Sequence, residues 1–252
     1  MTERPYAAWD HQRFCALTET EIARFASAIA KADPATPVPT CPGWTLAGLA
    51  KHLGIVHRWV EHILRNGLQT RISSRDVPVV LPDGGDWAGW IADGGAALVA
   101  VLRATEPEAP IWSWGGEQRA AYWSRRMLHE TVVHRADAEL ALGLRPDVAA
   151  EIAVDGIDEF FANLPFFADA VPAGAGETLH LHATDHPGEW TITLTPEGFG
   201  WTHGHAKCDV AVQATATDLM LLINRRIPQT GDGLTVFGKP DVLSAWLEKS
   251  VF

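Results

Sequence analysis

Cysteine is scarce in this chain of 252 residues. The three cysteines, Cys15, Cys41 and Cys208, lie far apart and form no CxxC pair. An odd number of scattered cysteines argues against a disulfide framework and is typical of a reducing cytoplasm. The first residues are polar and lack the apolar core of a signal peptide. We therefore expect a cytoplasmic protein.

Long hydrophobic runs are also missing, because no apolar stretch approaches the roughly 18 residues that a membrane helix needs. Basic residues are in the minority, with 20 Lys and Arg against 31 Asp and Glu and a net charge of −11. Such a chain repels phosphate backbones, so we expect no nucleic-acid partner and no membrane partner. The sequence contains no GxGxxG, P-loop, GxSxG or HExxH motif, so nucleotide binding and the common hydrolase mechanisms gain no support.

The first half of the chain carries apolar residues at steps of three and four, which predicts amphipathic helices. Thr45 and Asp86 stand where N-caps are expected, and Gly143 stands where a helix would end. The expected helices cover about residues 8–32, 46–64, 87–104 and 117–142. Four helices with these connections permit an up-and-down bundle.

The pattern changes after Gly143. A helix is expected over residues 148–163, and the period then becomes two in TLHLHAT, EWTITLT, GFGWTHG, CDVAVQAT and LTVFG, which predicts five short strands. Further helices are expected over residues 218–226 and from Pro240 onward. The predicted fold is thus a four-helix bundle domain over residues 1–146, followed by a small α+β domain over residues 147–252.

Glu130 and His134 are the first candidates for chemistry. They lie four residues apart in HETVVH, so they project from the same face of a helix and can share one cation. That face also carries Trp123, Met127 and Ala138, which indicates that it points inward. A buried glutamate is costly unless a partner neutralises it, and a metal ion would do so.

His52 lies on the apolar stripe of the preceding helix, beside Leu49 and Leu53. Facing helices of a bundle can bring it to Glu130 and His134. Two histidines and one carboxylate form a common catalytic zinc set with a fourth position for water or substrate, and they also suit ferrous iron. The ordinary alternatives are a surface Glu–His pair and a hydrogen-bonded core histidine.

Other histidines compete for a role as metal ligands. His57, His62 and His129 do not share the helix face of the three candidates, and we expect them to support the ligands or to face solvent. His180 and His182 lie on one face of a predicted strand. No carboxylate or cysteine obviously completes a ligand set with that pair, so we expect no second metal site there.

Two motifs resemble those of a known family. The segment TCPGWTLAGLAKHLGIVHRW, residues 40–59, resembles the opening motif of the mycothiol-dependent maleylpyruvate isomerase family, and YWSRRMLHETVVHRADAE, residues 122–139, resembles its second motif. Together they are similar to the wider DinB-like superfamily, a four-helix bundle with a metal at one end. The tail over residues 216–247 resembles the family's C-terminal domain, which is α+β and similar to sterol carrier folds. The family's ligands fall on His52, Glu130 and His134.

The resemblance implies a cytoplasmic actinobacterial enzyme that uses mycothiol as thiol cosubstrate and a divalent metal, with zinc the first expectation. It implies that the thiol binds the metal and becomes the nucleophilic thiolate. The partners would be this thiol and a small anionic or electrophilic substrate. An isomerase would act on a maleylpyruvate-like diacid, whereas a mycothiol S-transferase would leave the thiol attached. The alternatives are a non-catalytic small-molecule-binding protein that contains a metal and a DinB-like metal-dependent hydrolase.

Two further residues have open roles. Where the family tends to end a helix with Gly-Arg, this chain has Asn224, Arg225 and Arg226. Arg225 is the candidate catalytic residue, as a clamp for a substrate carboxylate, and the alternative is a solvated helix end. Asp137 either orients a ligand or forms a salt bridge with Arg135.

Overall fold

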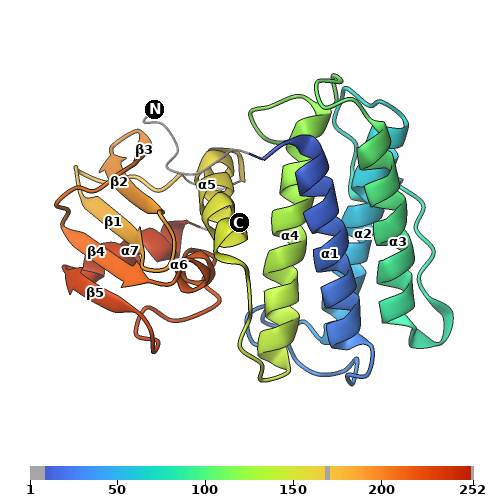
Figure 1. The fold of residues 1–252 in the computed structure, drawn as a ribbon, viewed down its shortest axis with the longest axis horizontal. Helices are drawn as coiled ribbons and strands as arrows, with labels where there is room; N and C mark the ends of the chain where they lie inside the picture. Colours follow the sequence, from blue (N-terminus) through green and yellow to red (C-terminus); the bar gives the residue numbers. More distant parts are fainter. Residues whose placement is uncertain (1–8, 168–170, 251–252) are drawn as a thin grey trace. The chain divides into compact units, whose positions relative to one another are not determined.

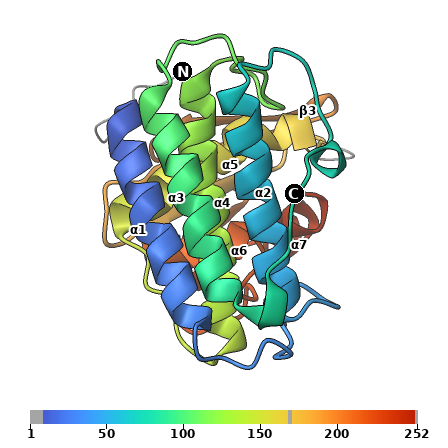
Figure 2. The same ribbon diagram turned by 90° about the vertical axis from the view of Figure 1, so that its right-hand side faces the viewer.

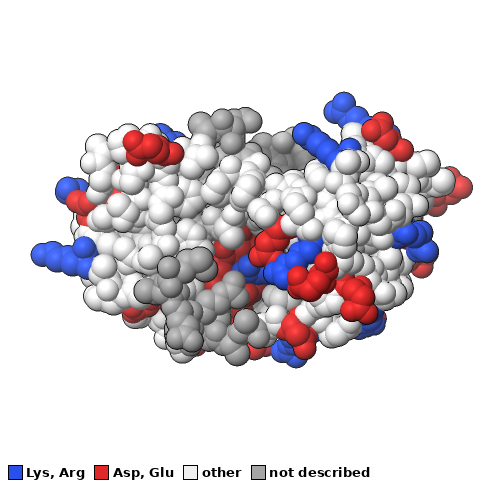
Figure 3. Space-filling model, turned by 90° about the horizontal axis from the view of Figure 1, so that it is seen from above, with Lys and Arg blue, Asp and Glu red and all other residues white. Residues whose placement is uncertain are grey.

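The computed structural model describes residues 9–167 and 171–250 (Figure 1). The chain divides into two compact units, one covering Trp9–Pro146 and the other beginning at Asp147. Among the described helices, none combines the length and the apolar character that crossing a membrane requires. On the face drawn in Figure 3, acidic and basic side chains of the described residues lie intermixed, so that face has no continuous basic patch.

The N-terminal unit contains the four long helices α1 to α4, which run side by side (Figure 2). Helix α1 packs against α3 and α4, and α2 packs against the same two helices, which confirms the predicted bundle. Two short 3₁₀ turns lie in the connection between α2 and α3. The helices are α1 (His11–Ile29), α2 (Leu46–Arg65), α3 (Trp87–Ala104) and α4 (Ala120–Ala141), and the turns are η1 (Ser74–Asp76) and η2 (Asp83–Gly85).

Side-chain caps explain where these helices begin. Asp10, Thr45 and Asp86 each accept a hydrogen bond from a backbone N–H in the first turn of α1, α2 and α3. Such caps satisfy donors that have no partner within the helix. At the other end of α4, Gly143 has a φ of 72°, and Leu144 N–H donates to the carbonyl of Glu139. This left-handed turn ends α4 where the sequence predicts.

Helix α4 begins later than predicted, at Ala120 rather than near residue 117. The Gln118 side chain accepts from Ser113 N–H and donates to Ser113 C=O, which holds the preceding residues in a loop. Arg119 is extended, with φ −151° and ψ 162°. These side-chain contacts compete with helix formation, and helical periodicity does not reveal them.

The C-terminal unit is α+β, and its five strands confirm the predicted ones. They form one mixed sheet in the order β3-β2-β1-β4-β5, with β1 parallel to β4 and the other pairs antiparallel. Helices α6 and α7 pack against β1 and β4, and α5 packs against α6. The elements are α5 (Ala150–Phe167), β1 (Thr178–Ala183), β2 (Glu189–Thr195), β3 (Gly198–His203), β4 (Val210–Ala214), α6 (Ala216–Ile223), β5 (Thr235–Gly238) and α7 (Pro240–Lys249).

The β1–β2 register separates two faces of the sheet. Leu181 pairs with Trp190, and both side chains are buried in the core of the unit. His182 pairs with Glu189 on the opposite face, because successive residues of a strand alternate between faces. His180 shares the face of His182. The sheet therefore places a histidine pair and a carboxylate together on its second face.

Two helices of this unit differ in length from the prediction. Helix α5 continues to Phe167 and includes Pro165 in its final turn. Helix α6 ends at Ile223 instead of residue 226, because Arg225 adopts a left-handed conformation with φ 60°. Arg226 N–H then donates to the carbonyl of Leu221, the bond that closes a left-handed C-cap.

Candidate metal centre

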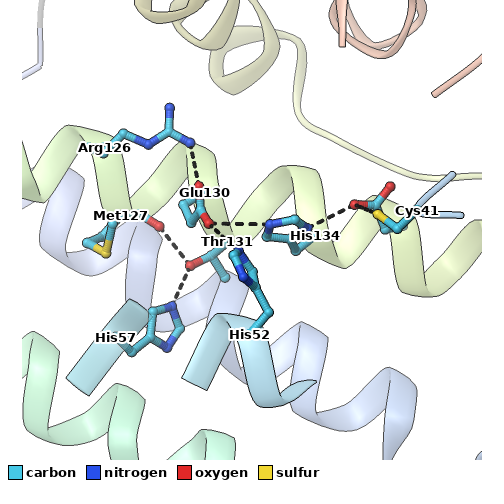
Figure 4. Close-up of polar contacts among 9 residues, drawn as sticks. Cys41, His52, His57, Arg126, Met127, Glu130, Thr131 and His134 are labelled. Atoms are coloured by element: carbon cyan, nitrogen blue, oxygen red, sulfur yellow. Dashed lines mark hydrogen bonds and ion pairs between the residues drawn. The ribbon is translucent and has the colours of Figure 1, made fainter. Parts of the chain in front are cut away.

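The structure brings together the three predicted ligands at one place in the N-terminal unit (Figure 4). His52 comes from α2, and Glu130 and His134 come from successive turns of α4. Glu130 Oε1 lies 3.2 Å from His52 Nε2 and 3.3 Å from His134 Nε2. The three ligand atoms all lie within 4.8 Å of one another. Two imidazole nitrogens and one carboxylate oxygen are thus close enough together to bind the same small cation.

The cluster lies at the rim of the bundle and not in its centre. The exposed fractions of the side chains are 38% for His52, 15% for Glu130 and 11% for His134. His52 was expected to face inward with Leu49 and Leu53. Those two leucines are buried, but the His52 side chain is only partly covered. The consequence is that solvent and small molecules can reach the cluster.

Asp137 orients one of the candidate ligands. Its Oδ2 accepts a hydrogen bond from His134 Nδ1 at 2.9 Å, which directs the Nε2 of that ring toward Glu130. Thr40 Oγ1 donates to Asp137 Oδ1 at 2.6 Å, and Cys41 Sγ donates to Oδ2 at 3.5 Å. A carboxylate that fixes the tautomer of a histidine is the usual support of a metal-ligating imidazole. Of the two roles considered for Asp137, this geometry matches the first.

Arg135 has other acidic partners. It forms ion pairs with Glu21 and Glu139, and its side chain is fully buried between α1 and α4. Its charge is thereby compensated, as a buried guanidinium requires. Arg135 therefore ties two helices of the bundle together.

Arg126 is a neighbour of the cluster that sequence analysis missed. Its Nη2 lies 2.8 Å from Glu130 Oε2, so it holds one carboxylate oxygen and leaves the other facing the imidazoles. The signal in the sequence is the four-residue spacing between Arg126 and Glu130, which places both on one helix face.

Trp44 forms a wall beside the cluster and was also missed. Its ring centroid lies 4.9 Å from that of His52 and 6.5 Å from that of His134. Trp44 belongs to the TCPGW segment just before α2, so motif resemblance pointed to this loop but not to the role of the side chain.

The protonation of the cluster follows from its partners. Burial favours a raised pKa for Glu130, but hydrogen bonds from His134 and His52 and the charge of Arg126 hold that pKa well below its usual range. For His134, burial acts to lower the pKa, but Asp137 and Glu130 raise it from 6.5 to about 9. In the metal-free protein His134 therefore carries a proton at neutral pH, and a divalent cation would replace that proton.

The competing histidines take different positions. His57 is fully buried, and its Nε2 donates to Thr131 Oγ1 at 3.0 Å, while Thr131 donates to the carbonyl of Met127. Burial lowers the pKa of His57 to about 3, so the ring stays neutral. His129 is also buried, whereas His62 is partly exposed. Neither His57 nor His129 is therefore a surface residue, and His57 binds Thr131, the neighbour of Glu130.

Arg225 lies in the C-terminal unit, at the left-handed residue that follows α6, and its side chain is exposed. In the same unit, His180 lies with Glu189 and His205 in a second group whose ligand atoms are within 4.8 Å of one another. The expectation that no carboxylate completes a set with the His180–His182 pair is wrong, because the hairpin register brings Glu189 to it.

A helical bundle with a His₂Glu cluster at its rim, joined to an α+β unit, defines a two-domain protein with a candidate metal centre. The chain matches the model of the mycothiol maleylpyruvate isomerase N-terminal domain over residues 15–139 and that of the corresponding C-terminal domain over residues 151–245. The chain thus belongs to the mycothiol-dependent maleylpyruvate isomerase family.

Comparison with solved structures supports the fold. The crystal structure of a mycothiol-dependent maleylpyruvate isomerase is similar with a TM-score of 0.61 and 16% identity, covering 90% of this chain and 93% of that one. A mutant of that enzyme is similar with a TM-score of 0.60, 15% identity and the same coverage. A UbiJ-SCP2 ubiquinone synthesis protein matches 30% of this chain and 65% of its own, with 16% identity and a TM-score of 0.26. The search of curated protein sequences gave no match.

Proposed function

We propose that this protein is a mycothiol-dependent metalloenzyme that adds the thiol to a small electrophile, most simply as an isomerase of a maleylpyruvate-like diacid. The observation that carries the proposal is the convergence of His52 Nε2, Glu130 Oε1 and His134 Nε2 at the open rim of the bundle. The donor set fits a divalent transition metal, and Asp137 supplies the carboxylate support that such a site needs. We take zinc as the first candidate and ferrous iron as the second.

Each residue has a definite task in this proposal. His52, Glu130 and His134 would hold the cation, and Arg126 would keep Glu130 ionised and turned toward it. A bound divalent cation would supply one chemical effect, the lowering of the pKa of a coordinating thiol so that the thiolate is present at neutral pH. His52 and Trp44 are both partly exposed, so a thiol would approach the cluster from the solvent side of these two residues.

Isomerase and S-transferase activity differ in what happens to the carbon–sulfur bond after the thiolate has added to the substrate. In an isomerase the sulfur would add to one carbon of a conjugated cis double bond, and the π electron pair would move onto the conjugated carbonyl as an enolate. The resulting single bond would rotate, and the enolate would expel the thiolate to restore the double bond as trans. In an S-transferase the new carbon–sulfur bond would remain, because the enolate takes up a proton or a leaving group such as chloride departs. Arg225 is proposed as the clamp for a substrate carboxylate, since a guanidinium binds a carboxylate through two parallel hydrogen bonds.

The test is thiol-dependent turnover of maleylpyruvate by metal-loaded protein, compared with transfer to chlorodinitrobenzene. We expect isomerisation that requires both mycothiol and metal. His52→Ala and Glu130→Ala should each lose one equivalent of metal per chain together with this activity. His62→Ala removes a partly exposed histidine of the same helix and is the matched control, for which metal content and turnover should be unchanged.

Other outcomes assign the chain to other classes. Transfer without isomerisation would identify an S-transferase. Hydrolysis of esters or amides without thiol would identify a metal-dependent hydrolase. Metal binding with no thiol binding in a titration would contradict the proposal and favour a non-catalytic binding protein. Unchanged metal content in both ligand variants would show that the three residues do not hold the ion.

A further inference from the structure

A second cluster of imidazole and carboxylate groups lies on the C-terminal sheet. His180 and His182 project from β1, and Glu189 lies directly opposite His182 at the start of β2. His205 follows β3 in the next loop. Gly204, its neighbour, donates its N–H to the carbonyl of Glu189, so the loop is fixed beside β2. Three segments that are separate in the sequence thus bring their polar side chains to one point.

The geometry of this cluster centres on one carboxylate. Glu189 Oε2 lies 3.8 Å from His180 Nε2 and 3.8 Å from His205 Nδ1, and the three ligand atoms are all within 4.8 Å of one another. The other oxygen, Oε1, contacts His182 Nδ1. His182 therefore holds the carboxylate in place while the second oxygen faces two further imidazoles.

The Nε2 atom of His180 has no hydrogen bond, because Glu189 Oε2 lies 3.8 Å away, beyond hydrogen-bond distance. The His180 side chain is 3% exposed, so this nitrogen is buried. A buried polar atom without a partner costs free energy, and proteins rarely leave one in place without a reason. Burial also lowers the pKa of His180, which keeps its ring neutral with a lone pair available to a metal. A cation between His180 and Glu189 would satisfy this nitrogen.

The spacing suits such an ion. Zinc binds nitrogen and oxygen at about 2.0–2.2 Å, so two ligands of a tetrahedral ion lie roughly 3.4 Å apart. The separations of 3.8 Å need to close by only a few tenths of an ångström. Glu189 also lines a pocket of about 470 Å³, so a hydrated ion can approach this carboxylate from solvent.

We propose that His180, Glu189 and His205 form a second binding site for a divalent transition metal, with zinc as the representative ion. The site uses no residue of the His52 cluster and goes beyond the proposed activity. Because its ligands come from β1, β2 and the loop after β3, the ion would tie these segments together. Binding to the folded state alone would then raise the thermal stability of the protein.

The test is metal stoichiometry in the full chain and its variants. After loading with zinc and dialysis, the wild type should hold two equivalents per chain, measured by mass spectrometry of the metal. His205→Ala and Glu189→Gln should each lose one equivalent and keep the other. His205 is 74% exposed, so this variant is expected to fold normally, as circular dichroism would check. His52→Ala should lose the other equivalent, and the double variant of His52 and His205 should lose both.

The control variant is His186→Ala, and the second measurement is the melting temperature. His186→Ala removes a histidine that lines the same pocket but is not among the three ligands, and it should retain two equivalents. Zinc should raise the melting temperature of the His52→Ala variant and leave that of the double variant unchanged. The proposal is overturned if wild type and His205→Ala hold the same number of equivalents, if Glu189→Gln loses none, or if His186→Ala alone loses one; a single equivalent in wild type that His205→Ala loses would instead count against the His52 site.

Discussion

Asp137 supports the candidate metal centre although it is not one of the three proposed ligands. It is fully buried, accepts from His134 Nδ1, and is itself held by Thr40 and Cys41 from the loop before α2. One carboxylate therefore couples the ligands of α4 to the segment that leads into α2. Its charge also raises the basicity of His134, which strengthens that ring as a ligand.

Replacing Asp137 by Asn tests this coupling. The amide keeps the shape of the side chain but removes the charge, so metal affinity at the His52 cluster should fall about 10- to 100-fold. Competition with a chromophoric chelator would measure the change. Glu139→Gln is the matched control, because Glu139 lies on the same helix and contacts Arg135 rather than His134. Equal affinities in the two variants would show that Asp137 does not support the ligand.

The raised pKa of His134 predicts a pH dependence in the metal-free protein. The group titrates at about 9 in the folded state and near 6.5 when exposed, so its stabilisation is complete below pH 6.5 and is lost as the pH rises through 9. The melting temperature of chelator-treated protein should therefore fall between about pH 7 and pH 9.5. A His134→Gln variant should show a flatter profile over that interval, and parallel profiles would contradict the assignment.

The residues of the candidate site that could be identified from the sequence are those that lie one helical turn apart. Glu130 and His134 are visible in this way, and His52 follows from its place on the neighbouring helix. Arg126 could have been found by the same four-residue rule. Glu189 could not, because its approach to His182 depends on a hairpin register that short strands do not reveal.

At the scale of the elements, α2 and α3 approach closely at a glycine. A Cβ atom on Gly54 would lie 2.0 Å from Trp90 Cζ3. Gly54→Ala should therefore destabilise the protein by about 1–3 kcal/mol, because overpacking forces a large ring to move. Gly48 is in the same helix, where an added Cβ meets nothing closer than 3.8 Å. Gly48→Ala should stabilise by about 0.5–1 kcal/mol, since alanine favours a helix. Urea denaturation would measure both, and destabilisation of equal size would contradict the packing argument.

Helix α6 ends before a residue with an unfavourable backbone conformation. Arg225 has a φ of 60°, a conformation that costs a residue with a side chain about 1 kcal/mol and costs glycine little. Arg225→Gly should therefore raise the melting temperature. If Arg225 clamps the substrate, the same variant should lower kcat/KM by about tenfold or more. Arg225→Lys separates the effects, because it keeps the charge and the strain. Unchanged kcat/KM in Arg225→Gly would remove Arg225 from the proposed mechanism.

Some helix boundaries could be predicted from the sequence and others could not. The caps at Thr45 and Asp86 and the stop at Gly143 are local signals, and the structure has all three. The start of α4 and the end of α6 were misplaced by about three residues. The first boundary is set by the hydrogen bonds between Gln118 and Ser113, and the second by the left-handed conformation of Arg225. The spacing of apolar residues along the sequence does not predict either feature.

At the scale of the whole molecule, the two compact units predict independent folding. Residues 9–146 contain all the ligands and supports of the His52 cluster. Expressed alone, this segment should show the circular dichroism of a helical bundle and bind one equivalent of zinc. An unfolded product, or one that binds no metal, would show that the bundle needs the rest of the chain.

The strand order has a consequence for biosynthesis. Chains emerge at about 5–20 residues per second, and β1, β2 and β3 can pair as soon as they appear. The other edge of β1 has no partner until Val210–Ala214 has been made, because β4 adds to it in parallel. During that interval a central strand exposes its backbone groups, and such an edge pairs readily with other chains. A premature stop between β3 and β4 should therefore yield an aggregating polypeptide, whereas a stop before β1 would leave no exposed strand edge in this unit.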